Sequence, residues 1–167
     1  MHRMALSQIT WNDVQQLPDD GNRYEAIAGE LHVTPAPTVR HQWISGELER
    51  SQYALVHDSA AGIVLHAQVG VEFPSTGEGV QPDIVVEILS PGTQRRERGV
   101  KLKLYDSQGV SECWIVDPVA CAVDAWRFHG GAHCERHTDR LTVRLAGEVL
   151  GEIDLGPVFK EPGAAAP

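Results

Sequence analysis

The spacing of apolar positions changes along the chain, and each change predicts a different element. Apolar residues recur at helical intervals between residues 38 and 57, which predicts one long helix. A short helix is expected to begin after Thr10, because Thr10 and Asp13 have the spacing of a capping box, and to end before Pro18. Residues 93–108 predict a third helix, which is basic.

Short apolar runs bounded by turn residues predict the strands. Residues 83–89 form a nearly continuous apolar run with two acids, which is typical of a strand buried on both faces. Residues 23–33 predict a hairpin that turns near Ala28 and Gly29. The other expected strands lie within residues 63–65, 69–73, 112–116, 119–128 and 141–155. This order of helices and strands indicates a mixed α/β fold.

Length and composition fit one globular domain. The chain has 167 residues, of which 42% are hydrophobic and 22% are charged. We expect residues 1–160 to form a single domain and residues 161–167 to be a disordered tail. No apolar run reaches the roughly 20 residues of a membrane span. Residues 1–8 lack the apolar region of a signal peptide, so the expected location is the cytoplasm.

Two acids in the apolar run are the first candidates for chemistry. Asp83 and Glu87 are four residues apart, so they lie on the same face of a strand. A carboxylate in apolar surroundings is unfavourable unless it is paired, hydrogen-bonded or bound to a metal. The pattern fits either a functional site or two solvated or ion-paired acids near the ends of the strand.

A basic segment follows the acidic strand directly. Five cations lie within nine residues: Arg95, Arg96, Arg98, Lys101 and Lys103. Such a run forms either a solvated helix face or a phosphate-binding surface. Next to an acid pair, it suits phosphodiester hydrolysis. The acids would hold Mg²⁺, which lowers the pKa of a bound water, and a lysine would orient that water. Because the formal net charge is −9, contact with nucleic acid has to come from a local patch.

Longer stretches of the chain resemble a known family. They are Arg23–Leu31, Val80–Thr93, Arg96–Tyr105 and Gly109–Pro118. Together they resemble the Uma-two family of restriction endonucleases, formerly a domain of unknown function, within the PD-(D/E)XK nuclease superfamily. The resemblance extends over roughly residues 5–160, and residues 82–118 are its most specific part.

The resemblance implies a restriction-endonuclease-like fold, in which helices flank a mixed central β-sheet. It also implies an endonuclease that hydrolyses DNA with Mg²⁺ or Mn²⁺. By position, Glu25, Asp83 and Glu87 correspond to metal ligands with a catalytic role. The usual catalytic lysine would stand two residues after the acid, where this chain has Leu89. The family lysine on the following helix corresponds to Lys101.

Two further expectations concern DNA. Arg95, Arg96 and Arg98 are expected to contact phosphates, which would position DNA without reading its sequence. By analogy with nucleases that cut both strands of a duplex, we expect the protein to be a homodimer.

The chain departs from the family pattern at the acidic strand. The family commonly has two strands with Pro-Asp, and here Asp83 stands in a single strand that fits both. On a straight strand, Asp83 and Glu87 are about 13 Å apart, whereas Mg²⁺ binds oxygens at about 2.1 Å. A bulge, a strong twist or Glu72 from the preceding strand would have to complete the site. Two hypotheses follow: an active nuclease, or a catalytically impaired nuclease fold that serves as a binding or structural module.

Overall fold

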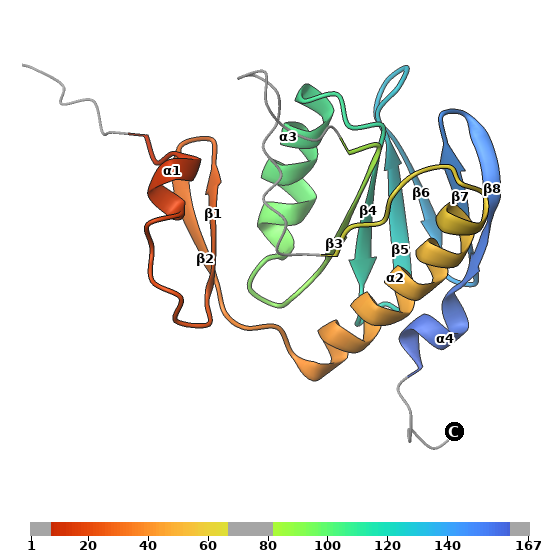
Figure 1. The fold of residues 1–167 in the computed structure, drawn as a ribbon, viewed down its shortest axis with the longest axis horizontal. Coiled ribbons are helices and arrows are strands. Elements are labelled where there is room, and N and C mark those ends of the chain that lie inside the picture. Colours follow the sequence, from red (N-terminus) through yellow and green to blue (C-terminus); the bar gives the residue numbers. More distant parts are fainter. Residues whose placement is uncertain (1–7, 67–81, 161–167) are drawn as a thin grey trace, which may run out of the picture. The chain divides into compact units, whose positions relative to one another are not determined.

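The computed structural model describes residues 8–66 and 82–160 and divides the chain into two compact units, residues 1–38 and 39–167 (Figure 1). The expected strand at residues 69–73 and the expected tail at residues 161–167 lie outside the described residues. The single domain expected for residues 1–160 stays a prediction.

The first unit contains a short helix and a β-hairpin. Helix α1 (Trp11–Val14) begins with the expected capping box between Thr10 and Asp13. Strands β1 (Arg23–Ile27) and β2 (Glu30–Thr34) pair in antiparallel register. Ala28 and Gly29 between them have φ angles of 53° and 81°. Two consecutive residues with positive φ are typical of the tightest hairpin turns, so the predicted cap and hairpin are confirmed.

Within the described residues, the second unit is built on a four-stranded mixed sheet (Figure 1). The strands in spatial order are β3 (Ile84–Ile88), β4 (Glu112–Asp117), β5 (Ala122–Arg127) and β6 (His133–His137). Strand β3 runs parallel to β4, and the β4–β5 and β5–β6 pairs are antiparallel. A separate antiparallel hairpin consists of β7 (Arg140–Leu145) and β8 (Glu148–Asp154).

The second unit also contains helices, which lie before, between and after these strands in the sequence. They are α2 (Val39–Asp58), the π-helical segment η2 (Arg96–Lys101), its continuation α3 (Leu102–Ser107), and α4 (Leu155–Phe159). None of the helices in the described part of the chain combines the length and the apolar character that crossing a membrane requires. The predicted long helix at residues 38–57 is confirmed, and the predicted basic helix is present with a π-helical first part.

The two faces of the sheet carry different buried clusters. Trp114 of β4 belongs to one cluster, which includes Ile44 of α2. Its neighbour Cys113 belongs to a second cluster, which includes Leu102 of α3. Successive strand residues point to opposite faces, so α2 and α3 cover opposite faces of the sheet. The predicted fold, a mixed β-sheet flanked by helices, is confirmed.

Three details differ from the sequence predictions. Residues 63–65 form no regular structure. Strand β6 and helix α4 were not predicted from the sequence. The side chains of β6 are polar and mostly exposed, so this strand lacks an apolar pattern. Strand β3 is half-buried rather than buried on both faces, since it lies at an edge of the sheet that the described residues form.

Candidate active site

Strand β3 directs Glu87 toward the helix that follows it. Ile84, Val86 and Ile88 pack against the cluster on the α2 face, whereas Val85 packs against the cluster that includes α3. Alternation along the strand therefore places Glu87 on the α3 face. Its side chain is 16% exposed, so the carboxylate sits at the margin of the core rather than in bulk solvent.

Lys101 and Tyr105 both contact Glu87. The Lys101 ammonium donates to Oε1 of Glu87 at 2.9 Å, and the Tyr105 hydroxyl donates to the same oxygen. Lys101 ends η2 and Tyr105 lies in α3, four residues later, so the two side chains project from one side of a continuous helix. The Lys101 side chain is only 6% exposed, which makes this a buried ion pair.

A second buried acid lies close to this pair. Glu97 is 1% exposed, and its Oε2 accepts a hydrogen bond of 2.7 Å from the Thr93 hydroxyl. Its Oε1 lies 3.5 Å from an Arg96 nitrogen. Burial raises the pKa of Glu97, and the negative charge of Glu87 adds to the increase. The sequence prediction did not include Glu97, although its position four residues before Lys101 was a usable signal.

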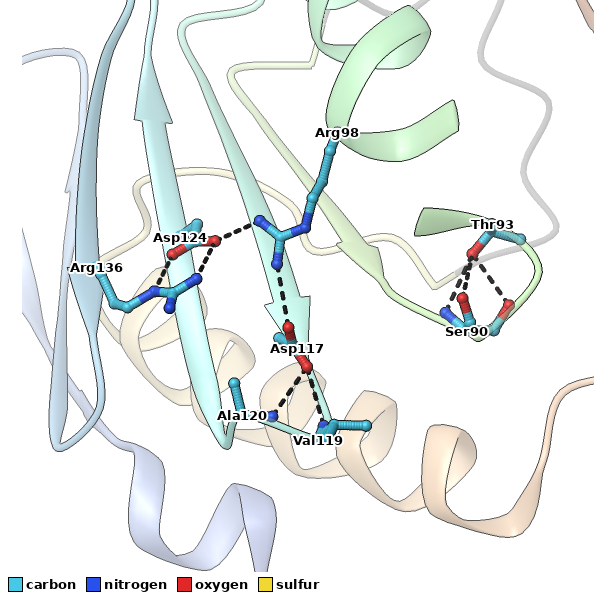
Figure 2. A network of polar contacts seen from close by, with 8 residues as sticks. All are labelled: Ser90, Thr93, Arg98, Asp117, Val119, Ala120, Asp124 and Arg136. Carbon is cyan, nitrogen blue, oxygen red and sulfur yellow. Dashed lines mark hydrogen bonds and ion pairs between the residues drawn. The ribbon is translucent and has the colours of Figure 1, made fainter. Parts of the chain in front are cut away.

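The guanidinium of Arg98 is held by two carboxylates of the sheet, as Figure 2 shows. It donates to Asp124 of β5 at 2.6 Å and to Asp117 of β4 at 3.1 Å. Arg136 of β6 donates to both oxygens of Asp124, at 2.6 and 2.8 Å. The hydrogen bonds from Arg136, followed by that from Arg98, lower the pKa of the Asp124 carboxyl despite its burial.

This network fixes the position of η2 over the sheet. Glu87, Ile115 and Asp124 stand side by side on β3, β4 and β5, according to the strand register. Arg98 and Lys101 lie three residues apart in η2 and reach the two acids of this row. In this structure Arg98 therefore serves to anchor the helical segment, and its expected phosphate contact stays a prediction.

The other residues predicted for the site lie at different places. Asp83 is exposed, directly before β3, and its carbonyl accepts hydrogen bonds from the backbone nitrogens of Ser111 and Glu112 at 3.1 and 2.9 Å. Glu87, and not Asp83, accepts the hydrogen bond of 2.9 Å from Lys101. Glu25 lies in β1 of the first unit, so its place beside the other acids stays a prediction.

The remaining predicted phosphate contacts come from η2 and the residue before it. Arg95 is exposed, whereas Arg96 has a side chain that is 12% exposed and pairs with Glu97. Of the three arginines, Arg95 is thus the one whose exposure best suits contact with a phosphate. The roles of Arg95 and Arg96 in DNA contact stay predictions.

Comparison with known proteins identifies the family. A model described as "Putative restriction endonuclease", that of the Uma-two family, matches residues 11–86 and 78–156. The chain belongs to this family. The two matched stretches share residues 78–86, which include Asp83. Such an overlap is expected if one strand of this chain corresponds to two similar Pro-Asp strands of the Uma-two family.

A solved structure shares the fold. The crystal structure described as that of "a putative nuclease belonging to DUF820 from Anabaena variabilis" aligns with a TM-score of 0.64 and 18% sequence identity. The alignment covers 90% of this chain and 97% of that chain. At this identity, the likeness supports the fold alone. The search of curated proteins found no match.

The carboxylate of Glu87 can supply one oxygen ligand to a hard divalent cation. Lys101 and Tyr105 both use Oε1, so Oε2 of this carboxylate takes part in neither contact. Mg²⁺ commonly binds one or two protein carboxylates and completes its shell with water and substrate oxygens. Among the described residues, no three His, Cys, Asp or Glu side chains converge as a metal-binding group.

Proposed function

We propose that this chain is a divalent-metal-dependent endonuclease that hydrolyses phosphodiester bonds of DNA. Membership of the Uma-two family supports a nuclease. The observation that carries the proposal is the buried contact between Lys101 and Glu87, because metal-dependent phosphodiester hydrolysis uses a carboxylate and a nearby ammonium. A buried lysine held at 2.9 Å from a carboxylate has a fixed location from which it can act.

Each residue has a distinct part in this proposal. Glu87 would hold Mg²⁺ or Mn²⁺ together with Asp83, and the ion would supply charge neutralisation and a water of lowered pKa. Lys101 donates from Nζ to the attacking water or to an oxygen of the phosphoryl group, where negative charge develops. Because Lys101 is buried, water does not screen its charge strongly, and the donor is positioned before DNA binds.

Positioning of DNA is assigned to cations next to the site. Arg95 directly precedes η2, the segment that carries Lys101, and Arg96 is its first residue. Phosphate contacts at these arginines would place the DNA backbone near Glu87. The formal net charge of −9 limits such contacts to a local surface. We further propose a homodimer, in which two sites would cut the two strands of a duplex.

The proposal is tested by cleavage of supercoiled plasmid by the full chain with Mg²⁺ or Mn²⁺. Substitution of Lys101 by Met is expected to lower the cleavage rate by about 100-fold or more, as loss of one preorganised donor does in other enzymes. Asp83→Ala and Glu87→Gln should abolish cleavage. Lys103→Met is the matched control, since Lys103 is exposed on the same helical stretch and should keep the rate within about twofold.

One observation favours a second function. The single Pro-Asp strand at Asp83, where the Uma-two family commonly has two, is expected of a nuclease fold with an impaired site. Such a domain would bind nucleic acid or another partner without cutting it. Absence of plasmid cleavage with both metals, together with retention of the plasmid in a gel-shift assay, would favour this function over the nuclease.

A further inference from the structure

We propose that Tyr105 is a positioning residue of this site, which holds one oxygen of Glu87 so that the other is available to a divalent cation. The inference rests on the proposed metal-dependent function and adds a residue that the comparisons do not assign. Its basis is the shared acceptor: the hydroxyl of Tyr105 and the ammonium of Lys101 both donate to Oε1 of Glu87.

The ring of Tyr105 is fixed by packing. Tyr105 is 8% exposed and belongs to the cluster on the α3 face, with Leu102 from its own helix and Cys113 and Ile115 from β4. Only two side-chain torsions lie between the backbone and the hydroxyl, so a packed ring places the donor accurately. The hydroxyl therefore stays at Glu87 without an ordering cost when a ligand arrives.

The ammonium of Lys101 and the hydroxyl of Tyr105 have different roles at the carboxylate of Glu87. Lys101 carries a positive charge on a flexible stem, and in the proposed reaction its ammonium must also serve the water or the phosphate. A carboxylate held by Lys101 alone would lose its orientation when the ammonium turned to the substrate. Tyr105 is neutral, so it orients Glu87 without placing a second positive charge beside the cation.

A tyrosine of the core that merely satisfies its hydroxyl is the competing explanation, because buried tyrosines usually find a hydrogen-bond partner. The two explanations differ in one measurable property. A structural tyrosine contributes to the free energy of unfolding, whereas a positioning tyrosine also sets the affinity of Glu87 for a metal. Loss of an outer partner of a metal ligand typically weakens metal binding about 10–100-fold.

The test is a titration of the full chain with Mn²⁺, in which electron paramagnetic resonance measures the free ion. Tyr105→Phe removes the hydroxyl and keeps the ring, so the cluster stays packed. We expect this variant to weaken Mn²⁺ binding about tenfold. Tyr24→Phe is the matched control, because the Tyr24 hydroxyl also donates to a carboxylate, that of Asp20, in the first unit. Its Mn²⁺ affinity should equal that of the wild type.

Cleavage kinetics give a second readout. Tyr105→Phe should need about tenfold more Mn²⁺ for half-maximal cleavage, with the maximal rate largely restored at saturating metal. Unchanged Mn²⁺ affinity in Tyr105→Phe, together with loss of binding in Glu87→Gln, would overturn the role of Tyr105 and leave the proposed function intact. Absence of both Mn²⁺ binding and plasmid cleavage in the wild-type chain would overturn both.

Discussion

Glu97 shows how strongly a single buried carboxyl is coupled to its neighbours. It receives a hydrogen bond from Thr93, and its pKa is raised above the ordinary 4.5, first by burial and then by the charge of Glu87. Between 4.5 and this raised value, the folded protein binds more protons than the unfolded chain. The contribution of Glu97 to stability is therefore largest at low pH and falls as pH rises through this range.

Glu97→Gln is expected to remove this pH dependence, because an amide can still accept the hydrogen bond from Thr93 but does not titrate. The difference in unfolding free energy between variant and wild type should move in favour of the variant as pH rises from 4.5 toward neutrality. Urea unfolding at a series of pH values measures it. Glu152→Gln, which alters a half-exposed acid, is the control. A difference that stays constant with pH would show that Glu97 titrates normally.

At the scale of elements, the attachment of η2 to the sheet decides whether Lys101 reaches Glu87. Arg98 of η2 is bound to Asp117 and Asp124, and Asp117 also accepts backbone hydrogen bonds from the turn after β4 (Figure 2). The Ser90–Thr93 loop, which leads from β3 to η2, is closed by hydrogen bonds of Thr93 with Ser90. The segment that positions Lys101 is thus tied to β4 and β5 through Arg98, and the loop before it is closed by its own hydrogen bonds.

Asp124→Asn is expected to loosen this attachment. The substitution leaves the guanidiniums of Arg98 and Arg136 without their shared carboxylate, of which 6% is exposed. We expect a loss of about 2 kcal/mol, less than for fully buried pairs because Arg136 is half-exposed. Since the pKa of Asp124 is lowered, the wild type should lose this advantage as pH falls below 3.8. Urea unfolding at neutral and acid pH tests both points, and an equal deficit at every pH would contradict the second.

Local signals explain which elements could be predicted from the sequence. The β1–β2 hairpin depends on a turn at Ala28 and Gly29, and α2 depends on its own apolar spacing, so neither needs knowledge of the rest of the fold. Strand β6 was missed because an exposed edge strand carries no apolar alternation. Its backbone pairing with β5, which no local pattern records, makes it a strand.

The candidate site, like the fold, could be predicted from the sequence only in part. Glu87 and Lys101 could be named from residue type and resemblance, and the structure shows them in contact. Glu97 and Tyr105 each lie four residues from Lys101, but their involvement also depends on which side of η2 and α3 faces β3. That orientation follows from the parallel pairing of β3 with β4 and from the Arg98 anchor, both of which are contacts between distant residues.

At the scale of the whole molecule, a formal net charge of −9 has to be reconciled with a polyanionic substrate. Most of the surface will repel DNA, so binding should depend on a few cations and show a modest salt dependence. Arg95 is exposed next to η2, whereas Arg98 is bound to acids of the protein itself. Arg95 is therefore the arginine whose removal should change the affinity most directly.

Arg95→Gln is expected to weaken plasmid or duplex binding and to reduce the slope of log K against log salt by about 0.9, the change for one phosphate contact with B-DNA. Binding is measured by fluorescence anisotropy over a range of salt concentrations, with Ca²⁺ in place of Mg²⁺. Arg140→Gln removes the same charge from an exposed arginine of β7, so it controls for the altered net charge. Equal slopes for the two variants would show that Arg95 makes no phosphate contact. The affinity for DNA would then depend on the total charge of the protein.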